Sequence, residues 1–184
     1  YKSALSWVEK AIALQPENES AKISRKFMRL GYANSFVNNQ QYKQGEQTLK
    51  KVFEDFPNDK DVLLNLANLY LIIKQGDKAK NMYARYATNQ KDSITALNGI
   101  ALAEHINEND KEALRISKTA TVKVDQIDDV PLTESTYDRY VQALIWNRKF
   151  ITAKKKIDSL EVHYQNRNWI HALRATLGLY TGDA

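Results

Sequence analysis

The residues that could do catalytic chemistry are few and scattered. The three histidines, His105, His163 and His171, lie in different stretches of the chain. No two of them are three or four residues apart, the spacing that places two metal ligands on one face of a helix. Cysteine is absent, and no glycine-rich phosphate loop or serine elbow occurs. We therefore predict no catalytic residue, no metal site, no cofactor and no enzyme activity.

The charged residues are predicted to be solvated surface. Two acidic pairs, Asp128 with Asp129 and Glu108 with Asp110, lie in segments that are typical of turns. The formal net charge of +5 is modest for 184 residues. A nucleic-acid-binding protein usually carries a larger and more clustered positive charge, so the charge argues against a nucleic-acid ligand.

The composition favours an all-helical chain. Only three prolines and six glycines occur, while good helix formers such as Ala, Leu, Lys and Glu recur throughout. No apolar run approaches the roughly 18 residues that a membrane-spanning helix requires, so we predict no membrane span. The chain opens on Tyr1 without a basic and apolar leader, and we expect it to be a fragment of a longer polypeptide.

Small residues return with a constant period. Gly45, Ala79 and Ala113 are each 34 residues apart, and the same step separates three further alanines, Ala33, Ala67 and Ala101. A large apolar residue directly precedes each of these three alanines: Tyr32, Leu66 and Ile100. A fixed period of this length predicts an array of stacked helical repeats.

This pattern resembles the tetratricopeptide repeat, whose 34-residue unit has one small residue in helix A and another in helix B, bulky residues around both, and proline near its end. Pro57 occupies such a final position. The resemblance implies an all-α, right-handed superhelical solenoid of antiparallel helix pairs, with about nine helices. In this register residues 1–184 form a single helical-repeat domain with units 1–18 (helix B only), 26–59, 60–93, 94–127, 134–167 and 168–184 (helix A only).

The register has two irregularities. The step from Ala4 to Gly45 is longer than one period by about two helical turns, so we predict an extended helix over about 19–38. Residues 128–133 interrupt the array before it resumes. We expect Pro16, Pro57 and Pro131 to lie between helices. We also expect Asn58 and Asn109 to cap helices, and 74–77 to form a turn between helices.

The resemblance also implies where a partner binds, because the A helices of such an array line a concave groove. Asparagine recurs among the groove positions, and its amide can both donate and accept hydrogen bonds to the backbone of an extended peptide. The predicted partner-binding residues are Asn34, Asn38, Asn65, Asn68, Ile72, Asn98, His105, Arg139, Gln142 and Trp146.

The function expected from the resemblance is a non-catalytic scaffold that binds a partner protein or extended peptide. Lys-, Asn- and Tyr-rich repeats of irregular register are similar to bacterial arrays in envelope proteins for polysaccharide export or secretion, which favours periplasm or cell envelope over cytoplasm. The family's clamp for a C-terminal carboxylate is not matched, since Leu30, Asp61 and Thr95 occupy its basic positions. The alternative is a nucleic-acid-binding helical repeat, whose groove would be strongly basic.

Overall fold

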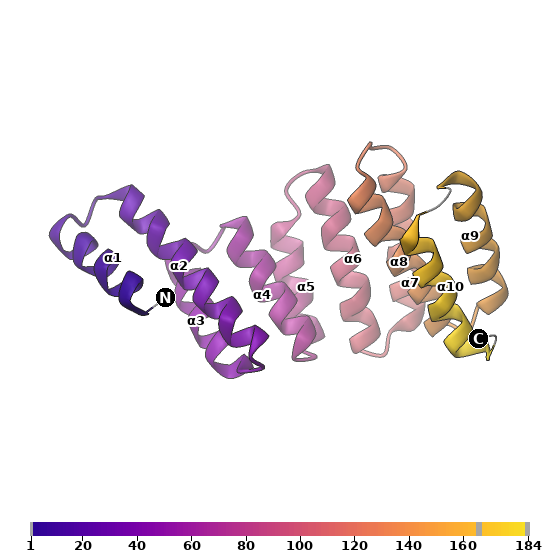
Figure 1. Ribbon diagram of the computed structural model, residues 1–184, viewed down its shortest axis with the longest axis horizontal. Coiled ribbons are helices and arrows are strands. Elements are labelled where there is room, and N and C mark those ends of the chain that lie inside the picture. The colour runs from indigo at the N-terminus through magenta and orange to yellow at the C-terminus, as the bar shows by residue number, and fades with distance from the viewer. Residues whose placement is uncertain (1, 165–166, 183–184) are drawn as a thin grey trace. The chain divides into compact units, whose positions relative to one another are not determined.

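The computed structural model describes residues 2–164 and 167–182, and all regular structure within these ranges is helical (Figure 1). Ten helices occur there, against the nine or so expected. They are α1 (Lys2–Leu14), α2 (Glu19–Asn38), α3 (Tyr42–Asp55), α4 (Lys60–Ile72), α5 (Gly76–Tyr86), α6 (Gln90–Ile106), α7 (Asp110–Val124), α8 (Val130–Trp146), α9 (Phe150–His163) and α10 (Asn168–Thr181). The terminal residues of the first and last predicted units, 1 and 183–184, lie outside the described residues, as do 165–166.

The chain divides into two compact units, which we call the N-terminal unit (Tyr1–Ile73, α1–α4) and the C-terminal unit (Lys74–Ala184, α5–α10). The division falls inside the predicted repeat 60–93, between its two helices. Successive helices run antiparallel within each unit (Figure 1). The predicted all-α class of stacked helix pairs is therefore confirmed.

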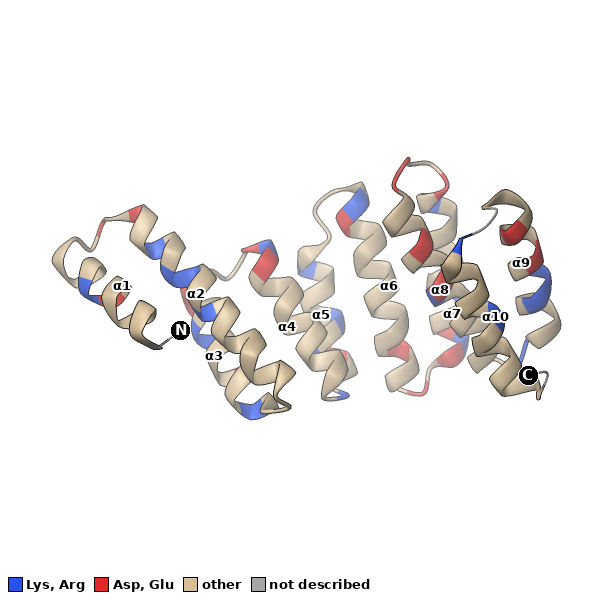
Figure 2. Ribbon diagram, viewed as in Figure 1, with Lys and Arg blue, Asp and Glu red and all other residues tan. Residues whose placement is uncertain are grey.

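The N-terminal unit contains the extended helix that the irregular spacing predicts. Helix α2 has 20 residues, the greatest length among the described helices. Helix α2 carries several basic residues (Figure 2), and their side chains contact the helices on both sides. Arg29 Nη2 lies 2.7 Å from Glu9 of α1, and its Nη1 lies 2.9 Å from Asp55 of α3. These ion pairs hold α1 and α3 against α2.

The periodic small residues allow close helix packing. Ala33, Ala67, Ala79, Ala101 and Ala113 are completely buried, as is Ala153 in the fourth repeat. A Cβ atom on Gly45 would lie 3.0 Å from Val37 Cγ2, which is tighter than ordinary contact. Larger side chains at these positions would force the paired helices apart.

Three boundary predictions need correction. Helix α4 is capped by Asp59, whose carboxylate accepts from the amides of Asp61 and Val62, and not by Asn58. Asn109 does precede α7 but makes no side-chain cap; its amide donates to Glu104 instead. Pro131 lies in the first turn of α8, where the missing N–H has no intrahelical acceptor to lose. The interruption before α8 is thus shorter than 128–133.

The turns between the helices of each pair share one backbone geometry. Gln40, Lys74, Glu108 and Arg148 all have positive φ, between 55° and 63°. Beside Glu108, its own N–H donates to His105 O and the N–H of Asn109 donates to Glu104 O, the arrangement of a Schellman cap. The turn folds the chain back sharply, so residues five apart in the sequence face each other across it. The turn predicted at 74–77 is shorter, since Gly76 already begins α5.

Candidate functional site

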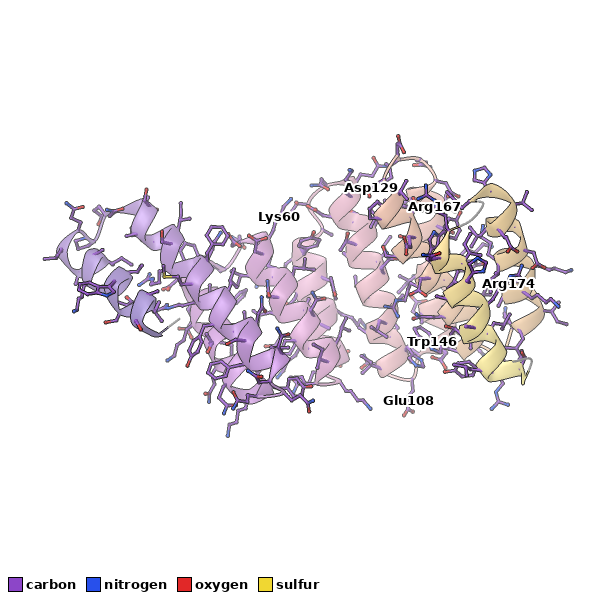
Figure 3. All side chains as sticks on the ribbon, in the orientation of Figure 1. Lys60, Glu108, Asp129, Trp146, Arg167 and Arg174 are labelled. Atoms are coloured by element: carbon purple, nitrogen blue, oxygen red, sulfur yellow. The ribbon has the colours of Figure 1, made fainter. Side chains whose placement is uncertain are left out.

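Helices α6 and α8 of the C-terminal unit place two aromatic side chains in direct contact. The rings of His105 and Trp146 are stacked, with centroids 3.8 Å apart and planes within 1° of each other. Both side chains are half-buried, so each keeps an exposed part. Trp146 lies at the C-terminal end of α8 (Figure 3). The pair forms a fixed aromatic surface rather than two independently mobile side chains.

A network of polar side chains continues from Trp146 along α8. The guanidinium of Arg139 lies 5.8 Å from the centroid of the Trp146 ring and donates to Gln142 Oε1 at 2.6 Å. Gln142 Nε2 in turn donates to Asp138 Oδ2 at 2.8 Å. The side chain of Gln142 is thereby held by both neighbours. We call Asp138, Arg139, Gln142 and Trp146, with His105, the α8 cluster.

Burial shapes the electrostatics of the α8 cluster. It raises the pKa of Asp138, although the positive charge of Arg139 and the hydrogen bond from Gln142 act in the opposite direction. Burial also lowers the pKa of Arg139, against the attraction of Asp138. Nε of Arg139 is buried without a hydrogen-bond partner in the described part of the chain. The cluster therefore keeps two charged groups in an incompletely compensated environment.

The turn after α6 orients His105. Nδ1 of His105 lies 2.5 Å from Oδ1 of Asp110, and because an ionised carboxylate can only accept, the imidazole donates. The amide of Asn147, which caps α8, donates to Asp110 O at 2.7 Å. The turns that follow α6 and α8 thus hold the stack of His105 on Trp146 in place.

Asn98 takes a different role from the one predicted. Its Nδ2 donates to Thr136 Oγ1 at 2.9 Å, and its Oδ1 is buried without a hydrogen-bond partner among the described residues. The amide therefore joins α6 to α8 inside their contact. Its oxygen is not exposed to a partner on the surface.

The other five predicted groove residues lie in the N-terminal unit, on α2 and α4. Asn34, Asn38 and Asn68 are exposed, and Ile72 is 49% exposed. Asn65 is half-buried, and its Nδ2 donates to Asp61 O at 2.7 Å, one turn earlier in α4. Only the amide oxygen of Asn65 is therefore available to a ligand without breaking this hydrogen bond.

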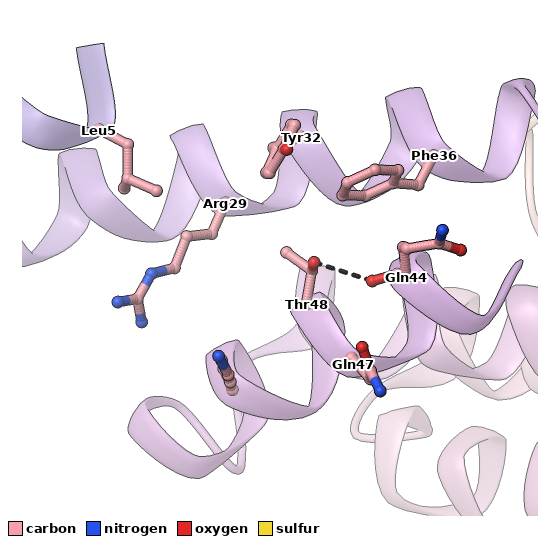
Figure 4. Close-up of a pocket in the computed structure, with 8 residues that line it drawn as sticks. Leu5, Arg29, Tyr32, Phe36, Gln44, Gln47 and Thr48 are labelled. Atoms are coloured by element: carbon pink, nitrogen blue, oxygen red, sulfur yellow. Dashed lines mark hydrogen bonds between the residues drawn. The ribbon is translucent and has the colours of Figure 1, made fainter. Parts of the chain in front are cut away.

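The described residues of each unit line cavities. One of about 300 Å³ in the N-terminal unit is walled by the Tyr32–Phe36 ring pair of α2 and by polar side chains of α3 (Figure 4). None of the predicted groove residues lines it. A second, of about 510 Å³, includes Trp146 and the turn before α7, with acidic and basic groups together. A third, of about 640 Å³, lies between α8 and α10.

Comparison with known proteins identifies the repeat. The sequence pattern of the tetratricopeptide repeat family matches residues 36–101. Nearly identical TPR-like repeats from Podosopora anserina superpose with a TM-score of 0.64 at 15% sequence identity, covering 95% of this chain and 87% of that one. A variant of the same protein gives 0.64 and 15% over 100% and 89%. The chain thus contains tetratricopeptide repeats over residues 36–101 and has the fold of such repeats.

Further comparisons add little to this assignment. A tetratricopeptide repeat protein from Parabacteroides merdae gives a TM-score of 0.44 at 14% identity, over 98% of this chain and 80% of that one. No curated protein matches the sequence significantly. Tetratricopeptide repeat proteins are generally non-catalytic scaffolds for protein–protein interaction, and this fold indicates a protein as the partner.

In the register predicted from the sequence, α6, α8 and α10 are successive A helices. The contact between α6 and α8 brings His105 together with Arg139, Gln142 and Trp146. Asp110 and Asn147, which orient these side chains, could not be recognised from helical spacing in the sequence. The turn geometry that brings Asp110 to His105, five residues apart, was the only available signal.

The described residues contain neither a candidate membrane-spanning helix nor a group of side chains that could bind a metal. Within residues 2–164 and 167–182, no helix combines the length and apolar character needed to cross a bilayer. Over the same residues, no three His, Asp or Glu side chains gather in a way that could hold a metal ion.

Proposed function

We propose that this protein is a non-catalytic scaffold that binds a segment of a partner protein along its A helices, with the α8 cluster as a principal contact. The observation that carries the proposal is the stack of His105 on Trp146, continued by Gln142 and Arg139. Aromatic and arginine side chains held in place before binding are typical of residues that dominate protein interfaces. Fixing them in advance lowers the entropy cost of binding.

The N-terminal unit by itself also offers amide groups to a partner. Asn34, Asn38 and Asn68 are exposed on α2 and α4, and Ile72 adds an apolar side chain. Exposed amides can pair with the backbone of an extended segment whatever its sequence. We assign Asn65 a smaller part, because its Nδ2 is already engaged.

We also infer a setting for this scaffold, an envelope protein for polysaccharide export or secretion. The support is compositional: Lys-, Asn- and Tyr-rich repeats with an irregular register resemble bacterial arrays of that kind. In such a setting the partner is another envelope protein. Fractionation of the source cells, followed by detection of the chain, tests this part separately from partner binding.

A pull-down with two matched variants tests the scaffold proposal. Gln142→Ala with Trp146→Leu removes exposed parts of the α8 cluster, while Val122→Ala alters an exposed apolar residue on α7, outside the A helices. We expect a discrete protein to be retained by the original chain and by Val122→Ala, and to be lost from the cluster variant. Nuclease treatment should leave its capture unchanged. Capture of nucleic acid alone, lost at raised salt, would instead favour a nucleic-acid-binding repeat.

A further inference from the structure

The cavity between α8 and α10 has acidic and aromatic walls. Its volume is about 640 Å³, within the usual range for ligand pockets. Helix α8 contributes Glu134, Ser135 and Asp138, and α10 contributes Asn168 and Trp169. Pro131 and Ala172 complete the lining. No basic side chain is among the described residues that line it.

The two carboxylates of the cavity suit a positively charged ligand. Glu134 and Asp138 are four residues apart on α8 and therefore share one face of the helix. Glu134 forms no ion pair or hydrogen bond with any described residue, and Asp138 accepts only from the neutral amide of Gln142. The cavity thus carries negative charge on a chain whose formal net charge is +5.

Several other acidic side chains of the C-terminal unit have basic partners, which Glu134 does not have among the described residues. The pairs are Asp129 with Lys91, Glu104 with Lys80, Glu112 with Arg115, and Asp158 and Glu161 with Arg174. Arg139 is close enough to attract Asp138, but its guanidinium is bonded to Gln142 and lies over Trp146. Acidic residues also gather in the loop before α8 (Figure 2). The carboxylates of the cavity are therefore available to a cation supplied from outside.

Trp169 adds a second feature that suits a cation. Its indole is half-buried, lies 5.8 Å from the ring of Tyr164 and packs on the core of the C-terminal unit. The face of an indole attracts a guanidinium or ammonium group through its quadrupole. A carboxylate pair beside a fixed indole matches the planar guanidinium of arginine best, because it can both stack and donate to carboxylates.

We propose that this cavity binds a basic side chain, preferentially arginine, in an extended segment of the partner protein. The inference rests on the proposed function and specifies the partner chemistry at one place on the A helices. The cationic group lies between Glu134 and Asp138 and against Trp169, while Ser135 and Asn168 pair with the backbone of the segment. The rest of the segment continues towards the α8 cluster, which shares Asp138 with the cavity.

A nuclear magnetic resonance titration tests the cavity directly. The probe is a short capped Gly-Ser peptide with one central arginine, compared with peptides that carry lysine, glutamine or glutamate at that position. The chain has three tryptophans, so its indole N–H signals include internal controls: Trp7 is exposed on α1 and Trp146 lies outside the cavity lining. We expect the arginine peptide to shift the Trp169 signal saturably, the lysine peptide less, and the glutamate peptide not at all.

Two variants, compared with the original chain, make the test specific. Glu134→Gln and Asp138→Asn together should weaken arginine-peptide binding at least about tenfold, as expected for loss of charge-assisted hydrogen bonds. Asp128→Asn removes an exposed carboxylate outside the lining and should leave binding unchanged. Superposable amide spectra of all three proteins confirm that the fold is retained. Equal shifts with the glutamate peptide, or undiminished binding by the double variant, would overturn the proposal.

The partner protein separates this inference from the proposed function. If a partner is captured in a way that depends on Gln142 and Trp146, yet the double variant binds it with unchanged affinity, the cavity proposal is wrong and the scaffold remains. A different result is that no protein is captured, while the arginine peptide still shifts the Trp169 indole signal and does not bind the double variant. The specificity of the cavity is then supported and the proposed function fails.

Discussion

The imidazole of His105 lies flat on the indole of Trp146, with centroids 3.8 Å apart, and its Nδ1 contacts Asp110 at 2.5 Å. Two A helices and the turn between α6 and α7 are joined in this one arrangement. His105 therefore serves two purposes: it supports the exposed aromatic surface of the proposed interface, and it ties α6 to α8.

Removal of the imidazole should lower the stability of the chain at position 105 but not at position 171. We expect His105→Ala to lower the free energy of unfolding by about 1 kcal/mol, the usual contribution of a ring pair beyond its buried area. His171→Ala is the matched control, because His171 is exposed on α10. Chemical denaturation of both variants provides the comparison. Equal stabilities would mean that the stack contributes nothing to the fold.

A second close contact lies between Gly99 of α6 and Tyr83 of α5. A Cβ atom built on Gly99 would lie 2.1 Å from Cζ of the Tyr83 ring. We predict that Gly99→Ala destabilises the chain by about 1–3 kcal/mol through overpacking, despite the better helix propensity of alanine. Tyr83→Leu in the same chain should restore part of the loss. A double-mutant cycle by thermal unfolding measures the coupling; additive effects would show that the two residues do not compete for this space.

The positive-φ turns offer a prediction of opposite sign. A residue other than glycine costs roughly 1–2 kcal/mol in this conformation. Glycine avoids that cost, but part of the gain is lost because glycine raises the conformational entropy of the unfolded chain. Glu108→Gly should therefore stabilise the chain by about 0.5–1 kcal/mol, and Glu108→Val should destabilise it. Urea denaturation of both variants tests this. Stabilisation by valine would contradict the backbone geometry reported for the turn.

Burial raises the pKa of Asp138, which fixes the sign of a pH effect. The folded chain holds the Asp138 proton up to a higher pH than the unfolded chain does. Stability from the protonated form is therefore present at low pH and is lost as the pH rises through the raised pKa. Once it is ionised, the carboxylate of Asp138 destabilises the fold.

Asp138→Asn should consequently raise the melting temperature near neutral pH, and its advantage should shrink as the solution is acidified. The same substitution is expected to weaken binding of a basic segment, so Asp138 favours binding at the expense of stability. Melting curves of both proteins across the acidic and neutral range decide this. A lower melting temperature of Asp138→Asn at neutral pH would show that attraction to Arg139 outweighs desolvation.

The periodic part of the fold could be predicted from the sequence, because it depends on residue size at local spacing. Ala33, Ala67 and Ala101 marked the tight helix contacts, and the extra residues before Gly45 predicted the length of α2. Helix starts were less accurate, since Asn58 and Asp59 both suit an N-cap and only the backbone geometry selects Asp59.

The candidate site was predictable in part. Groove positions on α8 followed from the repeat register, which named Arg139, Gln142 and Trp146 before their contacts were known. Pairing across a turn does not follow from helical spacing, so the contact of His105 with Asp110 was missed. Asn98 was assigned to the exposed groove because its position suits it, yet its amide pairs with Thr136 of the next A helix. Such contacts depend on how neighbouring helices approach each other.

Site-specific photo-crosslinking tests whether a partner protein binds at the α8 cluster. A photoreactive phenylalanine analogue replaces Gln142 on α8 or, in a matched variant, the exposed Ile151 on α9. We expect a discrete protein adduct from position 142 and none from position 151, in cells that contain the natural partner. Adducts from position 151 alone, or nucleic acid as the material crosslinked at position 142, would contradict it.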